Sequence, residues 1–214
     1  MIAIRPYQPR DRSAVRTLAC DTADRGRPLE RYFADRDLAA DLLTRYYTDD
    51  EPQASWIAED DGHVIGYLTG CLDSQRCRRA VAWRIAPAAV LRGLCHRALW
   101  SARTWRLLVA AVRTGLAGGF RRAIPLDRYP AHLHVNVQER FRAQQVGTRF
   151  IERFLAQASE AGARGIHVSV RADNVPACRV FQRLGFTELS RHPAVFPDGD
   201  VYRPHDTIIY GKRL

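Results

Sequence analysis

The strongest constraint on the fold of this 214-residue sequence is a strand–loop–helix–strand–helix pattern over residues 131–186. The run AHLHVNV at 131–137 alternates apolar and polar residues, and residues 166–170 do the same. Such alternation predicts strands with one buried face. Between the two runs, residues 147–161 carry apolar side chains at the spacing of an amphipathic helix. A second helix is expected to begin near Asn174 and to end at Gly185. The pattern predicts an α/β fold.

The rest of the chain adds shorter elements before and after this unit. Residues 2–5 predict a strand, and apolar spacing predicts one helix from Asp11 onwards and another over residues 38–46. Two β-rich runs flank Asp60-Asp61-Gly62, which is a strong hairpin signal. The final strands are expected over residues 186–190 and 207–210.

One segment carries most of the positive charge. The net charge is +10, and residues 74–130 contain twelve arginines and one acidic residue, Asp127. Two helix-length stretches, 86–99 and 101–114, indicate a helical hairpin inserted into a single domain that spans residues 1–214. Three of the four tryptophans lie in this insertion: Trp83, Trp100 and Trp105.

Three interpretations of the insertion stay open. The first is a hairpin packed on the body of the domain, with solvated arginines. The second is an amphipathic surface for an anionic membrane or nucleic acid, with tryptophans as anchors and with one arginine stripe formed by Arg92, Arg103, Arg106 and Arg113. The third is a lid or a homodimer contact beside the site. Membrane contact is only weakly indicated, and no nucleic-acid partner is expected.

The composition excludes several classes of protein. With 46% hydrophobic and 26% charged residues, the chain has enough apolar surface for a core, which excludes general disorder. Its five cysteines form no C-x-x-C pair, a pattern that argues against a disulfide scaffold or a zinc ribbon and is typical of reduced cytosolic thiols. The start lacks the apolar run of a signal peptide, so we expect a cytoplasmic protein. The scattered histidines predict no metal site.

The loop before the 147–161 helix has the features of an anion site. Residues 141–148 connect a strand to a helix, where successive backbone N–H groups and the helix dipole together suit a pyrophosphate. By itself this signal is common to many helix starts.

With its neighbours the loop becomes specific. The run RAQQVGTRFIERFL, followed by a strand and then NVPACRVFQRLGF, resembles the GCN5-related N-acetyltransferase (GNAT) superfamily. The matching residues are Arg142, Val146, Gly147, Asn174, Ala177, Leu184, Gly185 and Phe186. The resemblance implies a mixed, mainly antiparallel sheet flanked by helices, and acetyl-CoA as the acyl donor.

The resemblance also assigns the donor site. It implies that Arg142 and the 143–148 backbone hold the pyrophosphate and that Asn174 supports the donor. A backbone N–H near Val137 would polarise the thioester carbonyl. The implied binding residues are Val137, Arg142, Ala143, Gln144, Gln145, Val146, Gly147, Thr148 and Asn174.

Two positions depart from the family pattern. Gln145 stands where the family has the first glycine of the loop, and a side chain there can obstruct the approach of phosphates. Phe181 stands where the family often has a tyrosine that protonates the departing thiolate. A thiol pKa near 8.5 makes departure without a proton donor tolerable.

Amine acetylation needs a base near the amine, and two histidines are the candidates. His132 and His134 lie two residues apart, so they project from one face of a strand, and imidazole titrates near neutrality. Their strand is similar to the paired-histidine strand of arylalkylamine N-acetyltransferases, where such histidines relay the amine proton. The alternatives are hydrogen-bonded structural histidines, with Glu139 as a weaker base candidate. His167 and Ser169 share the polar face of the next strand and are expected at the surface, with a place in the lining of the cleft as the alternative.

These observations predict an N-acetyltransferase that moves an acetyl group from acetyl-CoA to an amine in a ternary complex. The acceptor is a small molecule or a peptide that the sequence does not identify. The alternative is a catalytically degenerate CoA-binding or interaction module that acts through the basic insertion.

Overall fold

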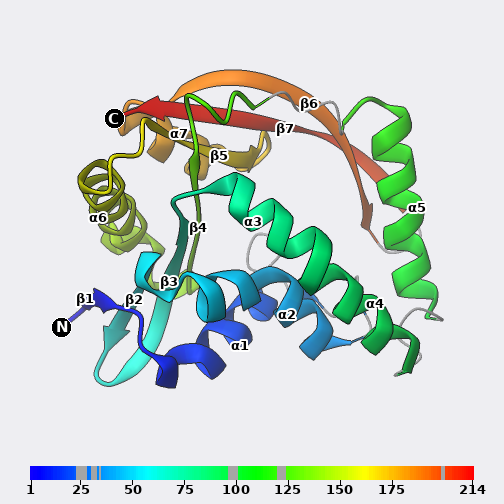
Figure 1. Cartoon of the computed structure of the whole chain (residues 1–214), viewed down its shortest axis with the longest axis horizontal. Coiled ribbons are helices and arrows are strands. Elements are labelled where there is room, and N and C mark those ends of the chain that lie inside the picture. The colour runs from blue at the N-terminus through cyan, green and yellow to red at the C-terminus, as the bar shows by residue number, and fades with distance from the viewer. Residues whose placement is uncertain (23–27, 30–32, 34, 96–100, 120–123, 199–200) are drawn as a thin grey trace.

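The computed structural model contains one seven-stranded sheet in the order β1-β2-β3-β4-β5-β7-β6 (Figure 1). It describes residues 1–22, 28–29, 33, 35–95, 101–119, 124–198 and 201–214. Strands β4 and β5 are parallel, and every other pairing is antiparallel. The expected mixed, mainly antiparallel sheet is confirmed. The strands are β1 Ala3–Pro6, β2 Ser55–Asp60, β3 His63–Cys71, β4 Ala131–Val137, β5 Gly165–Arg171, β6 Thr187–Asp198 and β7 Val201–Arg213.

Helices cover both faces of this sheet. Helices α6 and α7 pack on one face, and α1 with α2 lie on the other (Figure 1). The α-helices are α1 Arg12–Thr22, α2 Arg36–Arg45, α3 Ser74–Ala80, α4 Ala86–Cys95, α5 Ala102–Leu116, α6 Val146–Glu160 and α7 Val175–Arg183. Two π-helical turns continue helices, Tyr46–Asp50 after α2 and Val81–Ile85 between α3 and α4.

The core that supports the loop before α6 lies between α6 and the sheet. The apolar stripe of α6 packs there, with Phe150 and Phe154 at 0% exposure. Gly70 in β3 permits this approach, because a Cβ at that position would collide with the Phe154 ring. Close packing of this kind fixes where α6 begins.

The insertion between β3 and β4 differs from the expected hairpin. Its first helix begins at Ser74, twelve residues before the predicted start, because the Asp73 side chain caps it by accepting from the N–H groups of Gln75 and Arg76. Instead of folding back on α4, α5 packs along β6 (Figure 1). There Thr114 Oγ1 accepts a hydrogen bond from Val195 N–H at 2.9 Å. Trp100 and residues 96–99 lie outside the described part of the chain.

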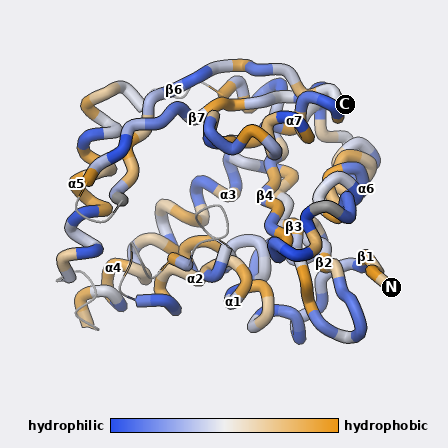
Figure 2. The backbone as a smooth tube through the Cα atoms, turned by 180° about the vertical axis from the view of Figure 1, so that it is seen from behind, coloured by the Kyte–Doolittle hydropathy of each residue, from blue (hydrophilic) through white to orange (hydrophobic). Residues whose placement is uncertain are grey.

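The insertion carries an apolar surface that the body of the protein does not cover. The buried residues of α5 are Thr104, Ala110 and Thr114, and the opposite side of the helix exposes Trp105, Leu108, Val109, Val112 and Leu116. Helix α4 adds exposed Val90, Leu91 and Leu94, and Figure 2 shows hydrophobic residues along both helices. We call these eight residues the α4–α5 apolar surface.

The predicted arginine stripe is not a single solvated row. Arg92 forms ion pairs with Asp37 and Asp41 of α2, and the guanidinium of Arg113 lies 4.1 Å from the centroid of the Tyr202 ring. Both side chains therefore turn towards the body of the protein. Among the described residues, no helix has the length and apolar content that crossing a membrane requires.

Candidate active site

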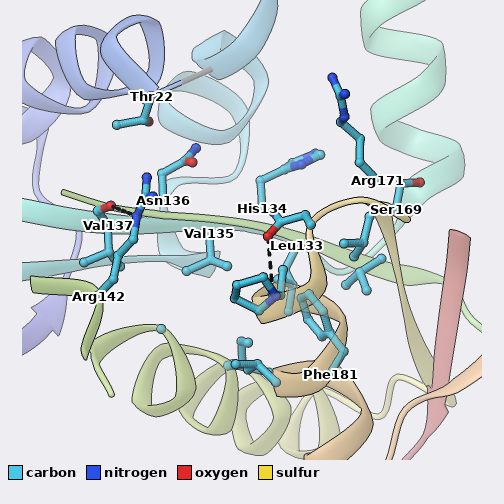
Figure 3. Close-up of a pocket in the computed structure, with 18 residues that line it drawn as sticks. Thr22, Leu133, His134, Val135, Asn136, Val137, Arg142, Ser169, Arg171 and Phe181 are labelled. Atoms are coloured by element: carbon cyan, nitrogen blue, oxygen red, sulfur yellow. Dashed lines mark hydrogen bonds between the residues drawn. The ribbon is translucent and has the colours of Figure 1, made fainter. Parts of the chain in front are cut away.

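The site lies where β4 and β5 separate. The parallel ladder between them contains two register pairs, Ala131 with Ile166 and His132 with His167. Beyond these pairs the strands diverge, and a cleft of about 500 Å³ lies between them and the helices α6 and α7. Figure 3 shows Thr22 and Phe181 on opposite sides of β4. The polar lining residues include His134, Asn136, Arg142, Ser169, Arg171 and Asn174.

The backbone of β4 presents hydrogen-bonding groups to this cleft. Gln138 N–H donates to the Ile65 carbonyl at 2.9 Å, so it points towards β3. Because N–H directions alternate along a strand, the N–H groups of Val135 and Val137 point the other way, towards the cleft. The Val137 carbonyl faces the same side, where it accepts from Arg142 Nε at 3.2 Å (Figure 3). A ligand in the cleft can therefore pair with β4 as a strand would.

The loop before α6 brings some of the predicted residues to the cleft and leaves others outside. Arg142 and Gly147 line it. A Cβ on Gly147 would meet nothing within 4 Å, so protein packing does not require glycine there and the space is left for a ligand. Gln144 and Gln145 are exposed outside the lining, and Val146 is buried in the core. Thr148 is half-buried outside the lining, and the Ala143 side chain lies outside the described part.

Gln145 adopts the conformation that explains the family's glycine. Its φ of 57° and ψ of 16° lie in the left-handed region, which costs an L-residue about 1–2 kcal/mol. The side chain is exposed and does not fill the cleft. The departure therefore strains the backbone of the loop without closing the site.

Asn174 has two roles that its amide allows together. Its side-chain oxygen caps α7 by accepting from Ala177 N–H at 3.4 Å, and the residue also lines the cleft. The expected helix cap is thus present, and the amide nitrogen remains for a ligand. Phe181 lines the cleft from the core side, stacked on Tyr210.

His132 and His134 meet the phenol of Tyr47. The Tyr47 oxygen lies 2.9 Å from Nε2 of His132 and 3.0 Å from Nε2 of His134. Nδ1 of His132 lies 2.7 Å from Ser74 Oγ, and that hydroxyl lies 2.5 Å from the Pro130 carbonyl oxygen. Five groups therefore form one hydrogen-bonded chain that ends at His134, the member that lines the cleft.

The donor and the acceptor of each hydrogen bond in this chain follow from the Pro130 carbonyl at its end. The Pro130 carbonyl only accepts, so Ser74 Oγ–H donates to it and Oγ accepts from Nδ1–H of His132. A neutral His132 then accepts the Tyr47 hydroxyl at Nε2, and the Tyr47 oxygen accepts Nε2–H of His134. The lone pair of His134 is left on Nδ1, which has no hydrogen-bond partner among the described residues.

Both histidines are held neutral. Burial lowers the pKa of His132 well below its ordinary value, and neighbouring His134, His167 and Arg78 lower it further. The ring of His134 is reached from the cleft, yet desolvation by the surrounding protein lowers its pKa to about 4, with a further contribution from His167. A neutral ring keeps its lone pair available for a proton.

The structure corrects one sequence expectation and adds residues that the sequence did not indicate. His167 is buried at 6% exposure, not at the surface, and its Nδ1 bonds to the Tyr129 carbonyl at 2.9 Å. Ser169, its neighbour on the same strand face, lines the cleft. No sequence motif indicated Tyr47 and Ser74 as site residues. They contact His132 from positions 85 and 58 residues earlier in the sequence.

Comparisons with known proteins identify the family of one segment and the fold of the chain. Residues 106–186, from α5 to the end of α7, match the model of the Acetyltransferase (GNAT) family. The solved structure of SsHAT is 24% identical with a TM-score of 0.72, over 99% of this chain and 98% of that chain. An N-acetyltransferase from Staphylococcus aureus Mu50 is 14% identical with a TM-score of 0.61, over 100% and 98%.

A third solved structure contains the donor that the sequence pattern implies. It is yncA from Salmonella typhimurium with its cofactor acetyl-CoA, 15% identical with a TM-score of 0.58, over 99% of this chain and 93% of that chain. Identities this low establish the fold. The resemblance stated from the sequence is confirmed: the model of the Acetyltransferase (GNAT) family matches residues 106–186, and the chain has the fold of solved acetyltransferases.

Proposed function

We propose that this protein transfers the acetyl group of acetyl-CoA to an amine, with both substrates bound at once. The observation that carries the proposal is the separation of β4 from β5 beside His134, whose Nδ1 has no hydrogen-bond partner in the part of the chain that the structure describes. The family match supports acetyl transfer in general.

The diverging strands and the loop before α6 hold the donor. Arg142 and the main-chain N–H groups at the start of α6 bind the pyrophosphate, which approaches closely because Gly147 has no side chain. The N–H groups of Val135 and Val137 donate to the pantetheine arm and to the thioester carbonyl oxygen. Donation to that oxygen stabilises the negative charge that develops on it during attack.

The hydrogen-bonded chain moves the proton of the amine. As the amine nitrogen bonds to the acetyl carbon, His134 Nδ1 takes the proton and its Nε2–H passes to Tyr47, whose own proton passes to Nε2 of His132. The carbon–sulfur bond then breaks and the thiolate of CoA leaves. Phe181 has no proton to give, so the thiolate is protonated by water.

The cleft favours neutral or carboxylate-bearing amines over polycations. Among the described residues that line it there are two arginines, Arg142 and Arg171, and no aspartate or glutamate. A polyamine would find no carboxylate in the lining, because Asp173 beside it is already in an ion pair with Arg171. An amino acid or a peptide N-terminus instead brings a carboxylate or a neutral amide. The acceptor class is therefore proposed as neutral or acidic amines.

An acceptor panel that follows release of free CoA tests this function. The panel contains amino acids, peptides and polyamines, and we expect turnover with members of the first two classes. Replacing His134→Ala together with His132→Ala should lower kcat by about 100-fold or more, because proton transfer contributes that much. Calorimetry should show unchanged binding of acetyl-CoA. Unchanged turnover in the double variant would remove both histidines from the mechanism.

The α4–α5 apolar surface favours a second role, contact with an anionic membrane. Its residues face away from the body of the protein, and α3, α4 and α5 contain no acidic residue. Two copies meeting through this face would bring two basic segments together, which disfavours a dimer there. Apolar side chains with tryptophan and neighbouring arginines instead suit the interface of negatively charged lipid.

Vesicle sedimentation tests the second role. The protein should bind phosphatidylserine vesicles more than phosphatidylcholine vesicles, and added salt should weaken binding. Val112→Glu on α5 should abolish it, whereas Leu43→Glu on α2, also exposed, should not. A dimer in solution that Val112→Glu dissociates, or binding indifferent to lipid charge, would contradict this role.

A further inference from the structure

Two buried thiols lie against the histidine chain without taking part in it. Cys71 ends β3 and Cys77 lies in α3, and they are 0% and 6% exposed. One ligand atom from each of Cys71, Cys77 and His132 lies within 4.8 Å of the other two. The two thiols lie close enough to shift each other's pKa, and Tyr47 lies close enough to lower the pKa of Cys77.

This donor set has the chemistry of a site for zinc or a related thiophilic divalent cation. Two thiolates and an imidazole are the nitrogen and sulfur ligands that tetrahedral zinc prefers. With zinc–sulfur bonds of about 2.3 Å, two sulfur ligands of a tetrahedral ion lie about 3.8 Å apart. The observed spacing therefore needs a contraction of at most about 1 Å at side-chain ends. The Tyr47 oxygen lies beside the same atoms and can supply the fourth position.

The cluster differs from a chance group of surface residues in how it is held. Its three members come from three elements, β3, α3 and β4, that the sheet and the Asp73 cap fix in place. Cys71 is paired directly with His132 in the β3–β4 register. None of the three is exposed, so their proximity is a property of the packed interior.

Metal binding and proton transfer compete for His132. Both of its ring nitrogens are engaged, Nδ1 with Ser74 and Nε2 with Tyr47. An ion on Nε2 takes the lone pair that would accept the Tyr47 proton. An ion on Nδ1 forces the ring proton onto Nε2, which also removes that acceptor. In either case His132 cannot accept the Tyr47 proton, so His134 cannot pass its own proton to Tyr47.

We propose that Cys71, Cys77 and His132 form an inhibitory binding site for a thiophilic divalent cation such as Zn²⁺. Binding forms two metal–sulfur bonds and one metal–nitrogen bond and releases the two thiol protons to solvent. The binding site stands on its own geometry, whereas the inhibition rests on the proposed acetyl transfer.

Cobalt spectroscopy tests binding without reference to activity. Titration of Co²⁺ into the reduced, full-length protein should give one equivalent of tetrahedral d–d absorption and a thiolate charge-transfer band, both removed by Zn²⁺. Cys71→Ser with Cys77→Ser should weaken binding by more than about 100-fold, beyond the loss from a supporting group. Cys20→Ser and Cys178→Ser, buried thiols elsewhere, should change nothing. Equal spectra from the cluster variant would overturn the site.

A second measurement uses the wild-type chain, so it does not depend on how the variants fold. Zn²⁺ should protect Cys71 and Cys77 from alkylation, read by mass spectrometry, and should leave the exposed Cys95 reactive. Equal labelling with and without Zn²⁺, or a Cys71–Cys77 disulfide with no metal uptake after reduction, would overturn the site.

Activity then separates the site from its proposed effect. Zn²⁺ should inhibit acetyl transfer by the wild type reversibly, with a chelator restoring the rate, and should inhibit the double cysteine variant far less. A cobalt spectrum without inhibition would overturn the inhibitory effect and leave the binding site standing. A cobalt spectrum from a protein that shows no transfer activity even when it is metal-free would instead contradict the proposed function.

Discussion

At the scale of single residues, one phenol decides how two histidines work. Tyr47 accepts from His134 and donates to His132, and Ser74 fixes the far end of the chain. The result is a defined tautomer, with the lone pair of His134 on the one ring nitrogen that has no partner among the described residues. Adjacent histidines alone do not set this tautomer, because each imidazole can carry its proton on either nitrogen.

Replacing Tyr47→Phe should therefore slow catalysis while binding persists. We expect kcat to fall by about 10-fold or more, less than the full effect of losing the base, because His134 keeps its own lone pair. Steady-state kinetics and calorimetry should show an unchanged Kd for acetyl-CoA. Tyr46→Phe is the matched control, since the Tyr46 hydroxyl donates to Glu51, which is not part of the histidine hydrogen-bond chain. Equal loss in both variants would indicate a structural role for Tyr47.

Gly147→Ala should move stability and affinity in opposite directions. The new methyl group meets no protein atom within 4 Å, and alanine suits a helix better than glycine, so the unfolding free energy should rise by about 0.5 kcal/mol. The same methyl group occupies the space proposed for the pyrophosphate, so acetyl-CoA should bind more weakly. Urea titration and calorimetry check the two effects. Unchanged affinity would place the phosphates elsewhere.

At the scale of elements, the periodicity of apolar residues predicted the individual strands and helices. The 131–137 strand, the opposite faces of its histidines and valines, and the α6 helix were all predicted from periodicity. A strand was predicted over residues 186–190, and the structure extends β6 to Asp198, through Pro193 and Pro197. The structure tolerates them because β6 is an edge strand, where one side of the backbone has no strand to pair with.

The turn between β4 and α6 should become more stable with the family's glycine. Gln145→Gly relieves the left-handed strain of about 1–2 kcal/mol, partly offset by the larger entropy of an unfolded glycine. We expect a net gain of about 0.5 kcal/mol in unfolding free energy. Gln144→Gly is the neighbouring control without a positive φ, and it should destabilise. Chemical denaturation that gave the same sign for both would contradict this account.

Helix α5 should depend on its bond to β6. Thr114→Val keeps the side-chain volume but leaves the N–H of Val195 without its acceptor, which costs about 1–3 kcal/mol. Thr44→Val is the matched control, because that buried hydroxyl only donates to a carbonyl of its own helix. Thermal unfolding should show a lower Tm for the first variant and a small change for the second. Similar shifts would indicate that the α5–β6 contact is energetically minor.

At the scale of the whole molecule, the sequence predicted the fold class and the strand–loop–helix unit that lies beside the cleft, but not the partners of its own histidines. Tyr47, Cys71 and Cys77 come to β4 from outside the 131–186 unit, so no spacing rule within a motif could indicate them. The scattered histidines predicted no metal site, and no motif indicated that the β3–β4 register would place Cys71 opposite His132. Long-range pairing, which periodicity does not encode, brings these residues together.

The short ladder between β4 and β5 leaves the two halves of the sheet joined by few backbone hydrogen bonds. Two register pairs are the seam that joins β1–β4 to β5–β7–β6. A ligand that pairs with the β4 backbone beyond this seam takes the place of an eighth strand. While it is bound, it connects the two halves of the sheet. Ligand binding should therefore slow hydrogen exchange of the backbone amides in β4 and β5. When the ligand leaves, the edges of both strands are exposed to solvent again.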